Sequence, residues 1–159
     1  MTEIRFGIDG GGRSRELLAQ NAWRTYFETS QRLRQALEVQ LKDDAGLDVS
    51  DYNTLLLLWE APERTLTMSA LAKKLVFSPS RLNYRIKVLV DAGLVTKTQC
   101  PGDGRAHNVA LTEAGARAFL SAGSQHKSYV DEVFFDHVSD AELEVIEAVF
   151  TRIGKALPE

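Results

Sequence analysis

The stretch covering residues 66–112 constrains the fold of this 159-residue chain more than any other part. Two short helices are predicted within it, one near residues 69–76 and a second near residues 79–92. Ser78 and Pro79 mark the start of the second helix, because a serine side chain caps orphan backbone N–H groups and a proline at the first helical position gives up a donor that would be unpaired anyway. The stretch therefore predicts a helix-turn-helix unit.

The second predicted helix has an inward and an outward face. Leu82, Ile86 and Leu89 recur at helical spacing, so one side of the helix is expected to pack inward. The outer side and its flanks carry side chains suited to phosphates and to base edges. These side chains are Ser80, Arg81, Asn83, Tyr84, Arg85 and Lys87.

Two runs of strand character follow Gly93, which is expected to end the helix in a left-handed conformation. The runs cover residues 94–98 and 107–111. Between them, the proline and glycines of residues 99–105 predict a long hairpin turn. A hairpin placed directly after a helix-turn-helix unit is expected to form its wing.

These features together resemble the multiple-antibiotic-resistance regulator (MarR) family of bacterial transcription factors. The resemblance extends from about Leu17 to Leu157, and each motif is weak alone whereas the ordered set is specific. The motifs are Leu71-Ala72, Ser78-Pro79-Ser80, Leu89, Gly93-Leu94-Val95, Asp103-Gly104-Arg105-Ala106, Val109-Ala110-Leu111-Thr112 and Gly115. The resemblance implies a homodimeric regulator of transcription, by family default a repressor.

The expected fold class is mainly α with a small antiparallel β wing, in which a winged helix-turn-helix DNA-binding lobe is joined to long N- and C-terminal dimerisation helices. Long apolar stripes near both ends of the chain favour a symmetric homodimer. The expected division is a flexible arm (1–13), an N-terminal dimerisation helix (14–46), the DNA-binding lobe (47–112) and C-terminal dimerisation helices (113–159). Within the lobe, a buried helix near residues 47–61 is expected to be capped by Ser50, and Ser139 with Glu142 predicts a capping box before the last helix.

The distribution of charge matters more than its sum. The whole chain carries a net charge of −3. Residues 64–107 hold eight lysines and arginines against two aspartates, a net charge of +6, so the remainder carries −9. This segregation would direct the basic surface toward double-stranded DNA. Solvated surface faces would be the ordinary explanation of such a cluster, but here it coincides with the predicted helix and wing.

A pair of such units would present two helices to major grooves about one helical turn apart, so an inverted-repeat operator is expected. Arg81 is the strongest candidate for bidentate contact with guanine, and Asn83 a weaker one for adenine. Arg105 at the wing tip fits a narrow minor groove, and the resemblance implies that Asp103 braces it. The full set of predicted DNA-binding residues is Ser78, Ser80, Arg81, Asn83, Tyr84, Arg85, Lys87, Lys97, Asp103 and Arg105.

The family resemblance also implies release from DNA by a small aromatic or phenolic ligand, whose binding residues the sequence leaves unassigned. Cys100, the only cysteine, and the scattered histidines His107, His126 and His137 leave a redox- or metal-responsive regulator of the same fold as alternatives. A winged helix used for protein association is a third alternative. No cofactor or metal site is predicted, and no set of catalytic residues can be assembled, so an enzyme is not expected.

No apolar run approaches the length of a membrane span, and no signal-peptide core is present at the N-terminus. A single cysteine agrees with a reducing compartment. The expected location is therefore cytoplasmic, with no membrane partner.

Overall fold

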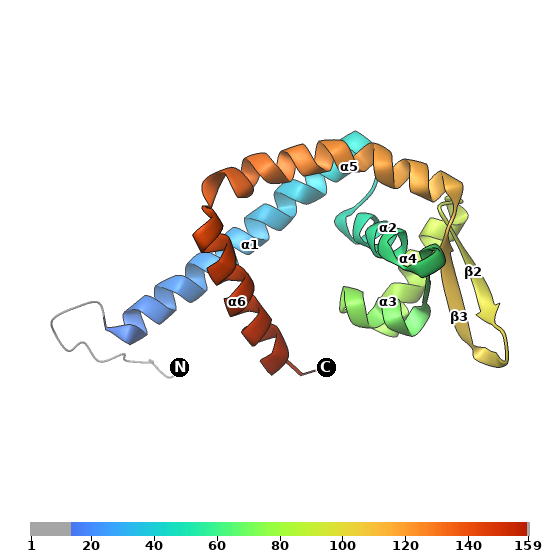
Figure 1. The fold of residues 1–159 in the computed structure, drawn as a ribbon, viewed down its shortest axis with the longest axis horizontal. Coiled ribbons are helices and arrows are strands. Elements are labelled where there is room, and N and C mark those ends of the chain that lie inside the picture. Colours follow the sequence, from blue (N-terminus) through green and yellow to red (C-terminus); the bar gives the residue numbers. More distant parts are fainter. Residues whose placement is uncertain (1–13, 159) are drawn as a thin grey trace, which may run out of the picture. The chain divides into compact units, whose positions relative to one another are not determined.

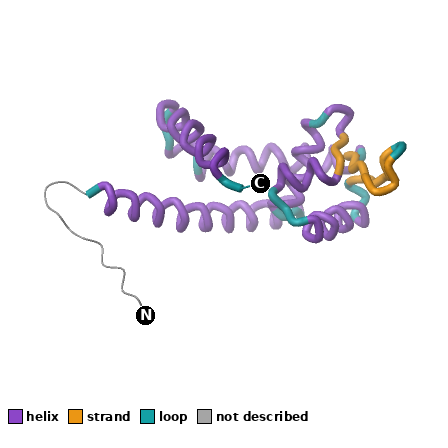
Figure 2. Tube along the Cα trace, turned by 90° about the horizontal axis from the view of Figure 1, so that it is seen from below, coloured by secondary structure: helices purple, strands orange, loops and turns teal. Residues whose placement is uncertain are grey.

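The structure is a computed structural model that describes residues 14–158. The chain divides into two compact units, one ending at Ala36 and the other running from Leu37 to Glu159. The elements are α1 (Arg15–Ala45), α2 (Val49–Glu60), η1 (Pro62–Arg64), β1 (Thr65–Thr67), α3 (Met68–Leu75), α4 (Pro79–Asp91), β2 (Val95–Cys100), β3 (Asp103–Leu111), α5 (Glu113–Val133), η2 (Phe135–His137) and α6 (Asp140–Ala156). Figure 1 labels the α-helices and the strands β2 and β3, and Figure 2 colours helices, strands and loops by type. The predicted class, mainly α with a small antiparallel β wing, is confirmed.

The first unit contains the N-terminal part of α1, whose apolar side chains are exposed. Trp23 is 65% exposed, and its ring centroid lies 5.9 Å from that of Tyr26 and 6.0 Å from that of Phe27. Leu17 and Leu18 are also exposed. The predicted flexible arm, residues 1–13, lies outside the described residues.

The second unit is built around α2, which contacts α3, α4, α5 and the sheet. Leu55 and Leu58 of α2 are fully buried, which confirms the predicted buried helix. The predicted cap was wrong. Asp48 caps α2, because its Oδ1 accepts a hydrogen bond of 2.8 Å from the backbone N–H of Asp51, whereas Ser50 lies inside the first turn.

The helix-turn-helix unit consists of α3 and α4. Thr67 caps α3 and Ser78 caps α4, with Pro79 at the first helical position as predicted. Between the helices, Val76 adopts the left-handed region, with φ 54° and ψ 45°. A β-branched residue is strained there. The side chain of Val76 is 88% exposed, so the turn is made without burying it.

The sheet has three antiparallel strands in the order β1-β3-β2. The strand β1 was not predicted, because three residues are too short to show a period. The hairpin between β2 and β3 is confirmed, but its turn is shorter than predicted. Both strands extend toward Pro101 and Gly102, and the register shifts between Gln99 and Cys100.

The joint between the helix-turn-helix unit and α5 is made by Thr112, the N-cap of α5. Its hydroxyl hydrogen is shared between the carbonyl oxygens of Gly93 (2.8 Å) and Leu94 (3.0 Å), and its oxygen accepts a hydrogen bond from the N–H of Gly115 (2.9 Å). A Cβ atom built on Gly115 would lie 2.0 Å from the Leu94 carbonyl oxygen, so only glycine allows this approach. Gly93 has φ 73°, as predicted for the end of α4.

The C-terminal helices follow the joint. Ser139 and Glu142 form the predicted capping box at the start of α6, with the Ser139 N–H 2.8 Å from Glu142 Oε2. His126 and His137 lie in different elements. The helix α5 ends at Val133, and His137 belongs to the separate 3-10 turn η2.

Candidate nucleic-acid interface

The helix α4 has a buried apolar face and an exposed polar face, with Val88 and Val90 also exposed. Leu82, Ile86 and Leu89 are 1% exposed and join the core. Ser80, Arg81, Tyr84 and Lys87 are exposed, as predicted, and Tyr84 keeps 64% of its surface accessible. Burying the three apolar side chains anchors the helix, because each contributes roughly 2 kcal/mol relative to an exposed position. The opposite side is left open to a partner.

The first turn of α4 orients Arg81. The Ser78 hydroxyl accepts a hydrogen bond of 3.4 Å from the backbone N–H of Arg81. The Arg81 guanidinium carbon lies 4.2 Å from the centroid of the Phe77 ring, an attractive cation–π arrangement that limits the freedom of the side chain. Sequence reasoning did not include Phe77, although it directly precedes the predicted cap.

Asn83 already uses its side-chain amide within the protein. Its Nδ2 donates to the carbonyl oxygen of Pro79 at 3.0 Å, and its Oδ1 accepts from the Lys97 ammonium at 3.0 Å. Bidentate recognition of adenine needs both the nitrogen and the oxygen of the side-chain amide. Asn83 therefore lies where predicted, but it would have to give up both contacts to read a base.

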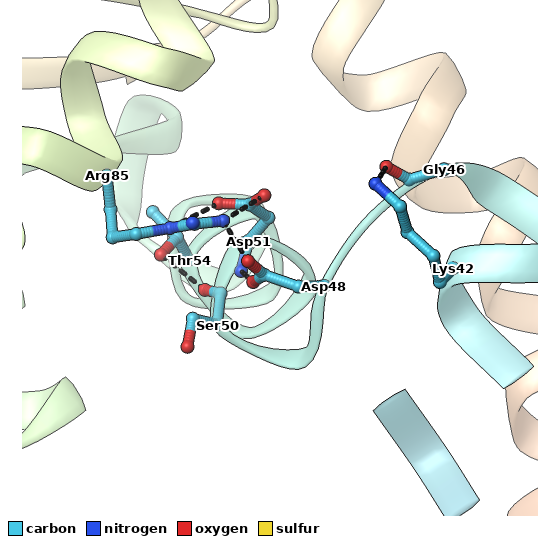
Figure 3. A network of polar contacts seen from close by, with 7 residues as sticks. All are labelled: Lys42, Gly46, Asp48, Ser50, Asp51, Thr54 and Arg85. Atoms are coloured by element: carbon cyan, nitrogen blue, oxygen red, sulfur yellow. Dashed lines mark hydrogen bonds and ion pairs between the residues drawn. The ribbon is translucent and has the colours of Figure 1, made fainter. Parts of the chain in front are cut away.

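Arg85 points away from the outer face of α4, as Figure 3 shows. Its guanidinium contacts the carboxylates of Asp48 and Asp51 at the start of α2, including a hydrogen bond of 3.1 Å from Nε to Asp51 Oδ1. Its side chain is 17% exposed. Arg85 was predicted to bind DNA because a helical projection of α4 contains no information about residues of other helices. The two aspartates of the contact were not predicted.

Burial controls the ionisation of this cluster. Burial, together with the neighbouring Asp48 carboxylate, raises the pKa of the Asp51 carboxyl, while Arg85 opposes that shift. Burial tends to lower the pKa of Arg85, but its hydrogen bond and its attraction to the two aspartates outweigh this, so its pKa is raised. The guanidinium is therefore held charged between two carboxyl groups.

Several cations of the predicted basic segment lie beside carboxylates. Lys87 donates to Asp91 one turn later at 2.9 Å, and this contact raises the pKa of the Lys87 ammonium. Arg64 lies 3.5 Å from Glu113 and 4.3 Å from the Trp59 ring centroid. With Arg85 turned inward, the positive surface is smaller than the sequence count implied. Arg81 and Lys97 remain exposed within it.

The wing is the hairpin of β2 and β3. Arg105 is exposed on β3, three residues after the turn, and Lys97 is exposed on β2. Gln99 Nε2 donates to the Gly104 carbonyl oxygen at 2.7 Å and stabilises the hairpin next to its tip. The side chain of Asp103 lies outside the described residues, so its predicted bracing of Arg105 stays a prediction.

Comparisons with known proteins agree on one family. The profile of the MarR family matches residues 45–106. The solved structure of AbsC, a MarR family transcriptional regulator from Streptomyces coelicolor, is 31% identical, with a TM-score of 0.83 over 86% of this chain and 92% of that chain. The chain belongs to the MarR family.

Two other relatives are informative. Sco3205, a MarR family transcriptional regulator from Streptomyces coelicolor solved in complex with DNA, is 29% identical, with a TM-score of 0.85 and 88% of each chain covered. The organic hydroperoxide resistance transcriptional regulator of Bacillus subtilis (strain 168) is 33% identical over 76 residues, which are 48% of this chain and about half of that protein. This MarR-family chain is therefore a DNA-binding transcriptional regulator with a winged-helix fold, and not an enzyme.

The binding residues of a small ligand were left unassigned by the sequence, and the aromatic side chains of this MarR-family chain fall into two groups. Tyr52, Phe119 and Trp59 form a packed row in the second unit, with centroid distances of 5.4 Å and 5.7 Å. Trp23, Tyr26 and Phe27 lie exposed in the first unit. An open hollow of about 410 Å³ in the second unit is lined by Gln40, Asp44, Ser124, Gln125, Ser128, Tyr129 and Glu132.

His126 extends the aromatic row and is half-buried. Its ring centroid lies 4.5 Å from that of Tyr52, and its Nδ1 lies 2.8 Å from Gln40 Oε1. Burial lowers its pKa, which favours the neutral ring.

Among residues 14–158, no group of three or more metal-ligating side chains is found, and no helix in that range is long and apolar enough to cross a membrane.

Proposed function

We propose that this protein is a homodimeric repressor that binds an inverted-repeat operator through α4 and the wing. The observation that carries the proposal is the exposed set Arg81, Tyr84 and Lys87, fixed on a helix whose other side is anchored in the core. Sco3205, which was solved in complex with DNA, matches this chain over 88% of each chain, and this supports DNA binding by the shared winged-helix fold.

Each predicted contact has a distinct role in this proposal. Arg81 reads guanine in the major groove, where a bidentate contact is worth roughly 1 to 3 kcal/mol of discrimination. Ser78, Ser80 and Tyr84 hold phosphates, while Lys87 and Lys97 add affinity that depends on salt. Arg105 enters the minor groove, braced by Asp103.

Exposed apolar side chains on α6 support the homodimer. Val145, Phe150 and Ile153 of α6 are between 42% and 61% exposed in the single chain, and Leu157, the C-cap that follows α6, is 63% exposed. Large apolar side chains gathered on one helix mark a surface that another chain covers. The exposed residues of α1 provide further apolar surface. The proposed division into DNA-binding lobe (47–112) and dimerisation helices (14–46 and 113–159) follows from this.

Selection of bound duplexes from a random pool, followed by sedimentation of the free protein and of the complex, tests the proposal. We expect an inverted repeat with half-site centres about 34–36 Å apart, occupied by one dimer. Transcription in vitro from a promoter that contains the selected site should fall when the protein is added. A monomeric protein at micromolar concentration, or a pool that yields no common sequence, would refute the proposal.

We further propose that a small aromatic or phenolic ligand weakens operator binding. The exposed aromatic side chains Trp23, Tyr26 and Phe27 support it, whereas Tyr52 and Phe119 are buried in the core. Titration of the operator complex with benzoate and with 4-hydroxybenzoate, followed by tryptophan fluorescence and by DNA anisotropy, tests this. Parallel changes in both signals are expected; unchanged anisotropy at saturating ligand would argue against release.

A further inference from the structure

The contact between Arg85 and the start of α2 is the most buried ionic cluster that the structure describes. The side chains of Arg85, Asp48 and Asp51 are 17%, 26% and 9% exposed. The two carboxylates precede the guanidinium by 37 and 34 residues, so the contact joins two elements that are far apart in sequence. Such a contact fixes the relative placement of α2 and α4.

The aspartates also hold the first turn of α2. Asp48 Oδ1 accepts the N–H of Asp51, while Asp48 Oδ2 faces Arg85 (Figure 3). One carboxyl group therefore serves both as the helix cap and as a partner of α4. In the same helix, Thr54 is fully buried, and its hydroxyl donates a hydrogen bond of 2.7 Å to the Ser50 carbonyl oxygen. The carboxylates of Asp48 and Asp51 therefore belong to a helical turn that is fixed in the core.

The chemistry of the pair is directional. A guanidinium is planar and donates in a fixed fork, so two acceptors from one helix turn restrict both its position and its plane. Arg85 lies one helical turn after Arg81, and its backbone is part of the same rigid helix. Fixing Arg85 against α2 therefore fixes the rotation of α4 about its own axis, and with it the direction in which Arg81 and Tyr84 project.

We propose that Arg85 is a positioning residue for DNA recognition: it does not contact DNA, and the Asp48–Arg85–Asp51 cluster sets the orientation in which α4 enters the groove. This inference rests on the proposed function, because it assumes that α4 reads the operator. It replaces the sequence-based prediction that Arg85 itself binds DNA. A phosphate contact by Arg85 would require it to leave two carboxylates unpaired, those of the buried Asp51 and the half-buried Asp48, which is strongly unfavourable.

The test compares three substitutions on α4 in the full chain: Arg85→Gln, Lys87→Gln and Arg81→Gln. Affinity for the selected operator and for a scrambled duplex is measured by fluorescence anisotropy at several salt concentrations. Arg85→Gln should weaken operator binding by about tenfold or more, because breaking a buried pair displaces the helix. Its slope of log affinity against log salt should stay that of the parent, since no phosphate contact is lost. Lys87→Gln, the matched control, should lower that slope by about one for each subunit.

The outcomes separate the two proposals. If Arg85→Gln lowers the salt slope as Lys87→Gln does, or leaves operator affinity unchanged, Arg85 is not a positioning residue. If Arg81→Gln also leaves operator affinity unchanged, the role of α4 in recognition fails as well, whatever Arg85 does. A second substitution, Asp51→Asn in the Arg85→Gln background, removes one unpaired carboxylate and should restore part of the affinity; a lost DNA contact could not be restored in this way.

Hydrogen exchange of the free protein provides a readout that needs no DNA and tolerates a weakly folded variant. Arg85→Lys keeps the charge but loses the fork. We expect faster amide exchange in the first turns of α2 and α4 in this variant, with unchanged exchange in α6. Exchange in α2 and α4 that matches the parent protein, together with parental affinity, would overturn the inference.

Discussion

The Lys97 ammonium on β2 donates a hydrogen bond to Asn83 Oδ1 on α4, 3.0 Å away. The contact joins the wing to the helix that carries Arg81, and it occupies the side-chain oxygen through which an asparagine would accept a hydrogen bond from adenine. The two residues that sequence reasoning assigned to separate DNA contacts are thus partners in the free protein.

This contact predicts different consequences for Asn83 and Arg81. Asn83→Ala should lower operator affinity by less than about tenfold and leave the base preference unchanged at every position, because its amide serves the protein. Arg81→Ala should cost about 1 to 3 kcal/mol and relax the preference at one base pair in each half-site. Anisotropy with a set of single-base operator variants measures both; a loss of adenine preference in Asn83→Ala would restore its role as a base reader.

Arg105 is expected to matter for DNA and not for folding. Arg105→Ala should weaken operator binding strongly, and most for duplexes whose flanks are A·T-rich, because such flanks concentrate negative potential in a narrow minor groove. Arg117, exposed on α5, provides the control: Arg117→Ala removes the same charge outside α4 and the wing. Salt-controlled gel shifts and sedimentation test this. If both substitutions lower operator affinity equally, the effect of Arg105→Ala is explained by the loss of net charge alone.

Gly115 predicts a large, local effect on stability. In Gly115→Ala the new methyl group would lie 2.0 Å from the Leu94 carbonyl oxygen and 2.8 Å from Leu111 Cδ1, so the joint after the wing must open, at a cost of about 2 kcal/mol or more. Gly154→Ala is the matched control, since nothing lies within 4 Å and alanine favours the helix by roughly 1 kcal/mol. Thermal unfolding at fixed protein concentration should move in opposite directions for the two variants.

His126 predicts a dependence of stability on pH. Because burial lowers its pKa below the ordinary value of 6.5, the unfolded chain binds a proton more readily than the folded one. The stabilisation of the folded state by neutral His126 is therefore fully present above pH 6.5 and is lost as the pH falls through the lowered pKa. The melting temperature of the parent should fall more steeply between pH 7 and pH 5 than that of His126→Gln. His137→Gln, at an exposed position, should keep the parental slope.

Local signals in the sequence were sufficient to predict much of the fold. Ser78-Pro79, Gly93 and the box of Ser139 with Glu142 each act within one helical turn, and each lies where predicted. The period of Leu82, Ile86 and Leu89 likewise identified the buried face of α4. These features are determined by neighbouring residues, so short stretches of the sequence are sufficient to predict them.

The remaining features depend on contacts between distant residues. Nothing within α4 indicates that Arg85 turns inward, because its partners lie 34 and 37 residues earlier. Asp48 competed with Ser50 for the cap of α2, and both are good capping residues. The strand β1 exists only because Thr65, Leu66 and Thr67 pair with β3. Pairing also extends the hairpin strands into residues whose composition is typical of a turn.

The connection between α1 and α2 is only Gly46, Leu47 and Asp48. Leu47 is buried, Gly46 has φ 67°, and Asp48 is bound to Arg85, so this connection has little slack. Because the connection is so short, a twist or shift at the C-terminal end of α1 would also move Asp48 and its contact with the guanidinium of Arg85. The end of α1 and the guanidinium on α4 are therefore linked through three residues, Gly46, Leu47 and Asp48.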